Sequence, residues 1–168
     1  MLRAYDFSRF STIVDVGGGD GTFMAALLQA YPDAKGIVFD RFACAGPVQS
    51  VAGDFFAAVP GGGDCYLLSR VLHDWNDEDA ARILRTVRRA MNGPRTVLLV
   101  ERLLDGDSSE EAALSDLNMM VMNGGRERTL EEFRALLAST GFALSRALPT
   151  EAPVFLIEAV SSAPHAVP

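Results

Sequence analysis

The sequence predicts an α/β fold with a mostly parallel, twisted sheet, an antiparallel pair of strands at its C-terminal end and helices on both faces. Three observations support this prediction. Short apolar runs alternate with stretches of helical periodicity along the chain. The first apolar run stops at a cluster of glycines, as at a tight turn between a buried strand and a helix. The length of 168 residues suits one domain with a substantial core.

The first strand is expected over Thr12–Val16 and the first helix over Asp20–Tyr31, with a glycine-rich turn between them. Gly17, Gly19 and Gly21 form a G-x-G-x-G pattern, whereas the dinucleotide-binding fingerprint places its third glycine one position later. Glycine lets the backbone approach a ligand closely, and the helix N-terminus offers unpaired N–H groups. An acidic residue in the turn would repel a diphosphate but not a cationic amino-acid group. The turn therefore resembles motif I of the Rossmann-like S-adenosylmethionine-dependent methyltransferases; the alternatives are a nicotinamide or flavin site, or a turn without a ligand.

The second strand, Lys35–Phe39, ends at Asp40. A carboxylate there can accept two hydrogen bonds from a ribose diol, although a turn or cap residue is the alternative. Residues 41–49 show no helical period, so the crossover to the next strand, Val48–Gly53, is expected to be shortened. Either the crossover helix is reduced to a loop, or this strand is disordered or placed differently.

An acidic residue and an aromatic residue, Asp54 and Phe55, follow that strand. The carboxylate can accept from the exocyclic amine of an adenine while the ring lies on the face of the base. The alternative is a core pair, Phe55 and Phe56, beside a cap residue.

A histidine follows the next strand. The run Asp64–Val71 is continuously apolar in its middle, as in a strand buried on both faces. His73 comes directly after it and precedes a predicted helix, Asp77–Met91, while the next strand, Thr96–Val100, ends at Glu101. Sites of α/β sheets lie at the carboxyl ends of their strands, so His73 and Glu101 are expected on the same edge. A lone histidine before a helix is otherwise usually structural.

The last third of the chain predicts two helices and the antiparallel strands. The expected elements are a helix over Glu110–Met122, a turn over Gly124–Arg128, a helix from the capping box of Thr129 and Glu132 to Thr140, strands over Phe142–Leu148 and Val154–Val160, and a frayed tail over 161–168. At the other end of the chain, Tyr5, Phe7 and Phe10 have nothing before them to pack on. We expect these three side chains to be exposed and the chain to self-associate through them.

Composition excludes several classes of function. The net charge of −7 argues against a nucleic-acid partner, because phosphate binding needs a basic face. No apolar run reaches transmembrane length and the N-terminus lacks a signal-peptide pattern, so neither a membrane partner nor secretion is expected. Cys44 and Cys65 show no metal-ligand spacing, and no metal is expected. Their interpretation as reduced thiols predicts a cytoplasmic protein.

A wider set of motifs resembles one family. The matching pieces, in the family's order, are Tyr5-Asp6-Phe7-Ser8, Val14-Asp15-Val16-Gly17-Gly18-Gly19-Asp20-Gly21, Gly53-Asp54-Phe55-Phe56, Leu68-Ser69-Arg70-Val71-Leu72-His73-Asp74-Trp75, Asp116-Leu117-Asn118-Met119-Met120 and Gly124-Gly125-Arg126-Glu127-Arg128-Thr129. Together they cover nearly the whole chain and resemble the small-molecule O-methyltransferases of plant secondary metabolism and bacterial antibiotic tailoring. The resemblance implies a Rossmann-like methyltransferase fold.

The resemblance also implies a role for each matching position. S-adenosylmethionine would be the cofactor and S-adenosylhomocysteine its product. Cofactor binding would fall to Asp15, Gly17, Gly18, Gly19, Asp40, Asp54, Phe55 and Ser69, the last near the amino-acid end. His73 would be the general base, with Glu101 and Glu127 as the acids that flank and orient it. Asn118, Met119 and Met122 would line the acceptor pocket, although a methionine cluster is more often ordinary core.

Members of this family carry a helical N-terminal dimerisation domain, which the sequence lacks. We therefore expect a single methyltransferase domain over residues 1–160, and either a homo-oligomer or a partner that supplies the missing region. The stretch after Asp40 departs from the family as well, because Arg41-Phe42 replaces the usual Leu-Pro. These two departures keep a methyltransferase-like binding or scaffold protein open as a second hypothesis.

The first hypothesis is methyl transfer to a hydroxyl of a small aromatic or polyketide-like acceptor. A phenol has a pKa of roughly 10, so a base that titrates near neutral pH assists the reaction. His73 is of the right type, and a carboxylate on its second nitrogen would fix the tautomer. A third hypothesis retains the cofactor but runs different chemistry, such as hydroxylation or decarboxylation.

Overall fold

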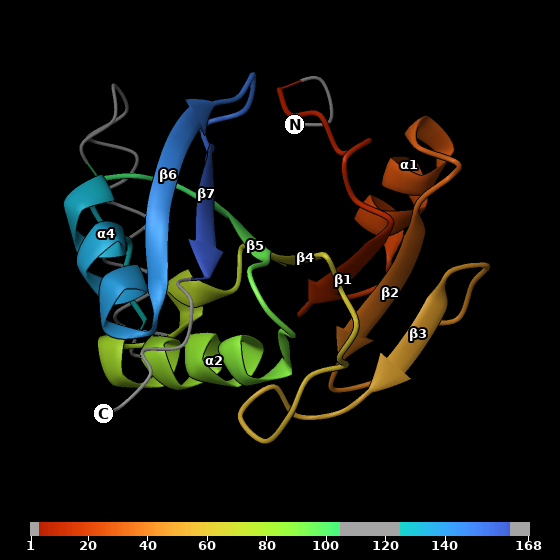
Figure 1. Cartoon of the computed structure of the whole chain (residues 1–168), viewed down its shortest axis with the longest axis horizontal. Coiled ribbons are helices and arrows are strands. Elements are labelled where there is room, and N and C mark those ends of the chain that lie inside the picture. The colour runs from red at the N-terminus through yellow and green to blue at the C-terminus, as the bar shows by residue number, and fades with distance from the viewer. Residues whose placement is uncertain (1–3, 105–124, 162–168) are drawn as a thin grey trace.

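The computed structural model describes residues 4–104 and 125–161 (Figure 1). Its elements in chain order are β1 (Thr12–Val16), α1 (Thr22–Ala30), β2 (Lys35–Asp40), β3 (Gln49–Ala52), β4 (Cys65–Ser69), the short 3-10 helix η1 (Leu72–Asp74), α2 (Asp77–Ala90), β5 (Thr96–Glu101), α4 (Leu130–Ser139), β6 (Phe142–Pro149) and β7 (Phe155–Ser161). The predicted helix over 110–122 and the candidate residues Asn118, Met119 and Met122 lie outside the described ranges, as does 162–168 of the predicted tail.

Within the described ranges the strands form one sheet in the order β3-β2-β1-β4-β5-β7-β6. The strands from β3 to β5 are parallel, and β7 runs antiparallel between β5 and β6. The α/β class and the C-terminal antiparallel pair are thus confirmed. From β1 the chain continues to β2 on one side, and from β4 it continues to β5 on the other side, so the strand order reverses between β1 and β4. The crevice outside such a switch point is where α/β sheets bind ligands.

Helices cover both faces of this sheet, as predicted. Successive strand residues point to opposite faces. Ile13 of β1 therefore joins the core under α1, where Met24 and Leu27 are fully buried, while the neighbouring Val14 joins the core under α2 and α4.

Polar residues at the helix starts explain why two of the helices begin where they do. The Asn76 side chain accepts from the Asp79 N–H at the start of α2, and the next three residues are acidic, which suits the helix dipole. Thr129 and Glu132 form the predicted capping box of α4.

The connection from β2 to β3 runs over residues 41–48 and contains no helix. β3 nevertheless pairs with β2 in parallel, from Ile37 with Gln49 to Asp40 with Ala52. This confirms the shortened crossover and settles the open alternatives: the crossover is a loop, and the strand is a short edge strand.

The prediction of exposed aromatic side chains at the N-terminus is wrong. Tyr5, Phe7 and Phe10 are 4%, 0% and 7% exposed and belong to the core under α1. Phe7 packs edge-on against Tyr31 at 5.8 Å between ring centroids. The sheet face beside α1 supplies the surface that the preceding sequence does not. In the described part of the chain, no helix is long and apolar enough to cross a membrane.

Candidate active site

The glycine turn after β1 needs its glycines for two reasons. Gly17, Gly19 and Gly21 adopt φ angles of 76°, 59° and 77°, which L side chains rarely tolerate. A Cβ on Gly17 would also lie 2.7 Å from Cγ2 of Val71, in the segment after β4. The turn is therefore packed directly against the chain that leads to His73.

Two carboxylates, those of Asp15 and Asp40, lie against the glycine turn. Asp15 of β1 is 1% exposed, and its Oδ1 has no hydrogen-bond partner among the described residues. Burial, with a smaller contribution from the charge of Asp40, raises the pKa of Asp15 to about 7. Asp40 Oδ2 accepts from the Gly19 N–H at 2.8 Å. A buried, unpartnered carboxyl oxygen beside an open glycine turn suits a ligand that brings a donor or a positive charge.

Gly18 has no room for a side chain, because a Cβ there would lie 2.7 Å from the Asp15 carboxylate. Ser69 ends β4. β4 pairs with β1 in parallel up to Asp15 with Leu67, so Ser69 lies at the same carboxyl edge of the sheet as the glycine turn. The predicted residues for the amino-acid end of a cofactor therefore meet at one edge of the sheet.

A cavity of about 320 Å³ lies at the carboxyl ends of β2 and β3. It is lined by Asp40, Arg41, Phe42, Gly53, Asp54, Phe55 and Phe56. The predicted ribose and adenine residues thus share one cavity. Asp54 Oδ1 also accepts from the Phe56 N–H at 2.8 Å, so Asp54 caps the backbone as the alternative interpretation expected.

Trp75 connects this cavity to the histidine segment. Its ring meets Phe55 and Phe56 edge-on, with centroids 5.9 and 4.8 Å apart. Aromatic rings in this arrangement attract each other beyond simple burial. The adenine candidates are therefore held in place by a residue two positions after His73.

His73 forms a buried pair with Glu101. Its Nδ1 lies 3.0 Å from Glu101 Oε2, and the other oxygen of this fully buried carboxylate accepts from the Leu72 N–H at 2.9 Å. A carboxylate on Nδ1 places the proton of the neutral ring on that nitrogen and leaves Nε2 as an acceptor. Nε2 lies 3.3 Å from Asp74 Oδ1, a contact that becomes an ion pair when the ring is protonated. Each ring nitrogen of His73 therefore faces a carboxylate oxygen.

Arg70 links the two predicted flanking acids. Its guanidinium lies 3.5 Å from Glu101 Oε2 and 3.3 Å from Glu127 Oε1. Glu127 is 1% exposed, and its Oε1 is the oxygen that lies 3.3 Å from the Arg70 guanidinium. Among the described residues Arg70 is the one non-glycine with a positive φ, 56°. Strain of this kind concentrates at functional sites.

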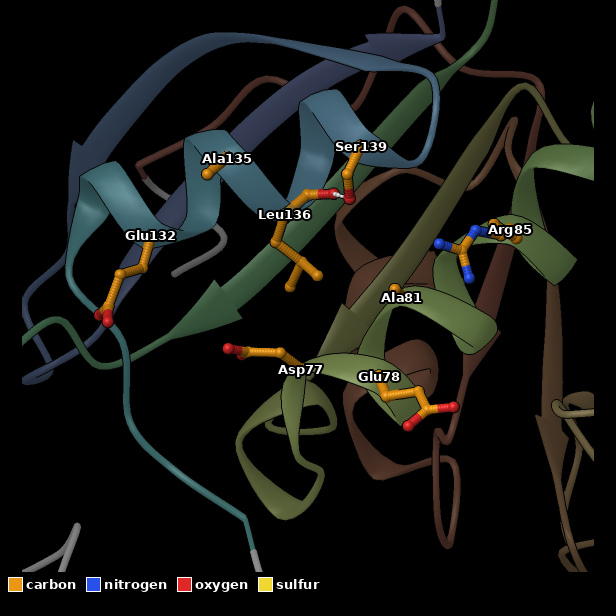
Figure 2. Close-up of a pocket in the computed structure, with 8 residues that line it drawn as sticks. All are labelled: Asp77, Glu78, Ala81, Arg85, Glu132, Ala135, Leu136 and Ser139. Atoms are coloured by element: carbon orange, nitrogen blue, oxygen red, sulfur yellow. Dashed lines mark hydrogen bonds between the residues drawn. The ribbon is translucent and has the colours of Figure 1, made fainter.

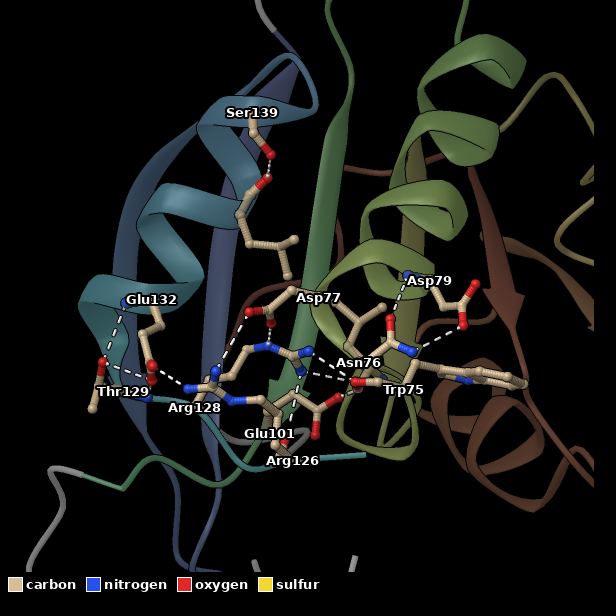
Figure 3. Close-up of polar contacts among 12 residues, drawn as sticks. Trp75, Asn76, Asp77, Asp79, Glu101, Arg126, Arg128, Thr129, Glu132 and Ser139 are labelled. Carbon is tan, nitrogen blue, oxygen red and sulfur yellow. Dashed lines mark hydrogen bonds and ion pairs between the residues drawn. The ribbon is translucent and has the colours of Figure 1, made fainter. Parts of the chain in front are cut away.

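Arg128 ties the segment over residues 125–129 to the histidine segment (Figure 3). It is fully buried, and its guanidinium donates to the backbone oxygens of Leu72 and Trp75 at 2.9 and 2.8 Å and to Asp77 Oδ1 at 2.9 Å. A Cβ on Gly125 would lie 2.1 Å from the His73 carbonyl oxygen, so the two backbones are in direct contact. Figure 3 also shows Arg126 bridging Asp77 and Glu132 on the surface.

A separate cavity of about 410 Å³ lies between α2 and α4 (Figure 2). Figure 2 shows Asp77, Glu78, Ala81 and Arg85 of α2 across from residues of α4. None of the predicted cofactor or catalytic residues lines it. We therefore assign the site to the edge with the glycine turn. In the described ranges no group of three or more acidic, histidine or cysteine side chains is placed to hold a metal ion.

Sequence reasoning missed Arg70, Trp75 and Arg128 as parts of the site. Arg70 and Trp75 flank His73 in the quoted motif, so proximity to the histidine was an available signal. Arg128 had none, since a turn arginine next to Glu127 gives no reason to expect full burial.

Comparison with known proteins places these features in a family. The O-methyltransferase domain family matches residues 1–143. The phenazine O-methyltransferase of Lysobacter antibioticus is 44% identical over 173 residues, which cover 95% of this chain and 51% of the relative. The O-demethylpuromycin O-methyltransferase of Streptomyces alboniger is 46% identical over 176 residues, covering 92% and 46%.

Solved structures agree. Human N-acetylserotonin methyltransferase in complex with S-adenosylmethionine superposes with a TM-score of 0.85 at 32% identity, covering 95% of this chain and 50% of that one. An O-methyltransferase from neocarzinostatin biosynthesis, in complex with S-adenosylhomocysteine and 1,4-dihydroxy-2-naphthoic acid, has a TM-score of 0.84 at 33% identity, covering 95% and 51%. The chain spans about half the length of the relatives it matches. It has the Rossmann-like methyltransferase fold and belongs to the O-methyltransferase domain family.

Proposed function

We propose that this chain forms the catalytic part of an O-methyltransferase that transfers a methyl group from S-adenosylmethionine to a hydroxyl of a small aromatic or polyketide-like acceptor. The buried His73–Glu101 pair, at the strand edge that also carries the glycine turn, is the observation that supports this most. The names of two relatives, a phenazine O-methyltransferase and an O-demethylpuromycin O-methyltransferase, support a small aromatic acceptor.

The residues around the turn fit the cofactor. Asp15 offers a buried carboxyl oxygen without a partner, and Gly19 has open space where a side chain would stand. Asp40 and Asp54 would bind the ribose and the adenine, both from the cavity at the ends of β2 and β3. When bound, S-adenosylmethionine supplies a methyl group on a sulfonium centre.

His73 acts as the general base in this proposal. Nε2 takes the proton from the hydroxyl of the methyl acceptor, while Nδ1–H stays hydrogen-bonded to Glu101. The Glu101 carboxylate stabilises the imidazolium that forms. The Asp74 contact at 3.3 Å stabilises the same charge on the other side of the ring. Glu127 acts through Arg70, because the guanidinium lies between it and Glu101. Alignment and exclusion of water supply the rest of the rate.

The remaining assignments are extensions of this proposal. Ser69 lies near the amino-acid end of the cofactor, while the acceptor-binding role expected of Asn118, Met119 and Met122 falls outside the described residues. The chain forms a homo-oligomer or binds a partner protein. The free thiols of Cys44 and Cys65 support a cytoplasmic setting.

Calorimetric titration with S-adenosylhomocysteine tests the cofactor assignment on this chain as it stands. Wild type is expected to bind, and Asp40→Ala to bind more weakly because the ribose loses its acceptor. Absence of heat with wild type at millimolar ligand would reject cofactor binding. A radiolabelled methyl-transfer assay over a panel of phenols then tests turnover.

A second candidate is a binding or scaffold protein without turnover, which the helix-free connection over residues 41–48 favours. The two assays separate the candidates, since a scaffold would bind S-adenosylhomocysteine and transfer no methyl group to any acceptor. If the chain instead retained the cofactor but ran different chemistry, the third hypothesis, it would consume a phenolic substrate without incorporating the labelled methyl group.

A further inference from the structure

Phe42 is a large apolar side chain that the fold leaves in solvent. It is 77% exposed, and it lines the cavity of about 320 Å³ at the ends of β2 and β3. Of the described large apolar side chains, only Val160, at 36%, is also exposed, and it lies on β7 at the other side of the sheet. Exposed apolar surface at the rim of a cavity is typical of a ligand-binding site.

The backbone holds Phe42 in this position. On one side, the Arg41 N–H donates to Asp40 Oδ1 at 2.6 Å. On the other, the Cys44 N–H donates to Ser50 Oγ of β3 at 2.8 Å, and the Cys44 sulfur packs close to Gly21. Phe42 thus lies between two anchored residues, and its exposure follows from the shortened connection.

A second aromatic residue, Phe55, lines the same cavity. Phe55 belongs to the segment that follows β3, and Trp75 supports its ring edge-on at 5.9 Å. The Gly53 N–H donates to the backbone carbonyl oxygen of Asp40 at 2.8 Å, which joins the segment after β3 to the end of β2. Phe42 and Phe55 therefore line the same cavity as the carboxyl-bearing residues Asp40 and Asp54.

We propose that Phe42 stacks on the purine of the nucleoside bound in this cavity and forms the wall that a crossover helix would otherwise supply. The inference rests on the proposed function, which puts a nucleoside there. Every purine presents a flat, apolar face, and stacking on an aromatic side chain buries both surfaces. Phe42 is in this sense a further cofactor-binding residue.

The experiment measures the affinity of Phe42→Ala, Phe42→Tyr and wild type for two ligands. S-adenosylhomocysteine carries the purine and the amino-acid end, while 5′-methylthioadenosine keeps the purine and ribose and lacks the amino-acid end. Phe42→Ala is expected to weaken both ligands by a similar factor, roughly 5- to 100-fold, the usual effect of removing one stacking partner. Phe42→Tyr keeps the aromatic face and is expected to bind like wild type.

Val160→Ala is the matched control, because it also removes exposed apolar surface, and it is expected to leave both affinities unchanged. Thermal melting checks that each variant folds. If Phe42→Ala binds both ligands like wild type while Asp40→Ala weakens both, Phe42 has no role at the purine and the proposed function stands. A loss for S-adenosylhomocysteine alone would place Phe42 at the amino-acid end and overturn the inference. If wild type binds neither ligand, the proposed function fails and this inference fails with it.

Discussion

The orientation of the His73 ring depends on individual contacts around it. Glu101 fixes Nδ1 at 3.0 Å and is itself held by the Leu72 N–H, while Arg70 contacts the same carboxylate oxygen as the ring. The imidazole therefore has little freedom to rotate. Substitutions here should change turnover more than binding.

His73→Ala is expected to lower methyl transfer by roughly 10²- to 10⁴-fold, because the acceptor loses its general base. The affinity for S-adenosylhomocysteine should stay unchanged, since the proposed role of the side chain is at the acceptor and not at the cofactor. Glu101→Gln should act in the same direction with a smaller effect. Steady-state kinetics and calorimetry measure the two quantities. Normal turnover in His73→Ala would reduce the histidine to a structural role.

The raised pKa of Asp15 predicts that the free energy of unfolding depends on pH. Its pKa is raised from 3.8 to about 7 in the folded protein, mainly by burial, so the folded state binds more protons than the unfolded state between these values. The free energy of unfolding should therefore fall as the pH rises through this window, by up to about 1.4 kcal/mol per pH unit from this group, and level off above it.

Asp15→Asn removes that titration, so its stability should fall less steeply than that of wild type between pH 4 and 7. Urea unfolding at a series of pH values measures both slopes. Parallel profiles would show that Asp15 does not titrate in this range.

At the scale of elements, the segment over residues 125–129 positions the histidine segment against α2 and α4. Arg128 reaches the carbonyl oxygens of Leu72 and Trp75, and Gly125 lets the two backbones touch. Buried carbonyls without donors are costly, so this arginine matters through hydrogen bonding rather than charge alone.

Arg128→Met keeps much of the side-chain volume and removes the donors. It should lower the free energy of unfolding by about 2–4 kcal/mol, because the carbonyl oxygens of Leu72 and Trp75 each lose a hydrogen bond from Arg128. Arg126→Met is the matched control in the same segment. Its ion pairs with Asp77 and Glu132 are at the surface, so the expected change is at most about 1 kcal/mol. Equal losses in the two variants would contradict the role assigned to Arg128.

At the scale of the whole molecule, the N-terminal segment over residues 5–10 is part of the hydrophobic core. The ring of Tyr5 meets Phe7 edge-on at 5.0 Å, and Arg9 forms an ion pair with Glu158 of β7 at 2.6 Å. The start of the chain thus joins the sheet face beside α1 to its C-terminal strand. The expected self-association through these aromatic residues loses its basis, because they are not exposed.

Phe7→Ala should destabilise the domain by about 3–5 kcal/mol, the usual cost of emptying a fully buried phenylalanine site. Phe42→Ala, at a site 77% exposed, should change stability by no more than about 0.5 kcal/mol. Chemical denaturation of both variants gives the comparison. A small effect at Phe7 would mean that the segment packs only loosely.

Patterns along the chain were enough to predict the order of the described strands and of the helices α1, α2 and α4, the glycine turn, the capping box of α4 and the shortened connection after Asp40. These features depend on neighbours in sequence: apolar period, positive φ and hydrogen bonds within a few residues. The family motifs added the candidate residues from Asp15 to Glu101, and the structure brings the cofactor candidates and His73 to one edge of the sheet.

The tertiary structure alone decided what those residues contact. The unpartnered oxygen of Asp15, the position of Arg70 between two carboxylates and the burial of Arg128 arise from segments distant in sequence, such as Leu72 and Arg128. The burial of the N-terminal aromatic residues likewise depends on a sheet face built by other strands. A local pattern carries no information about which remote surface will cover a side chain, and burial and charge pairing are set by that surface.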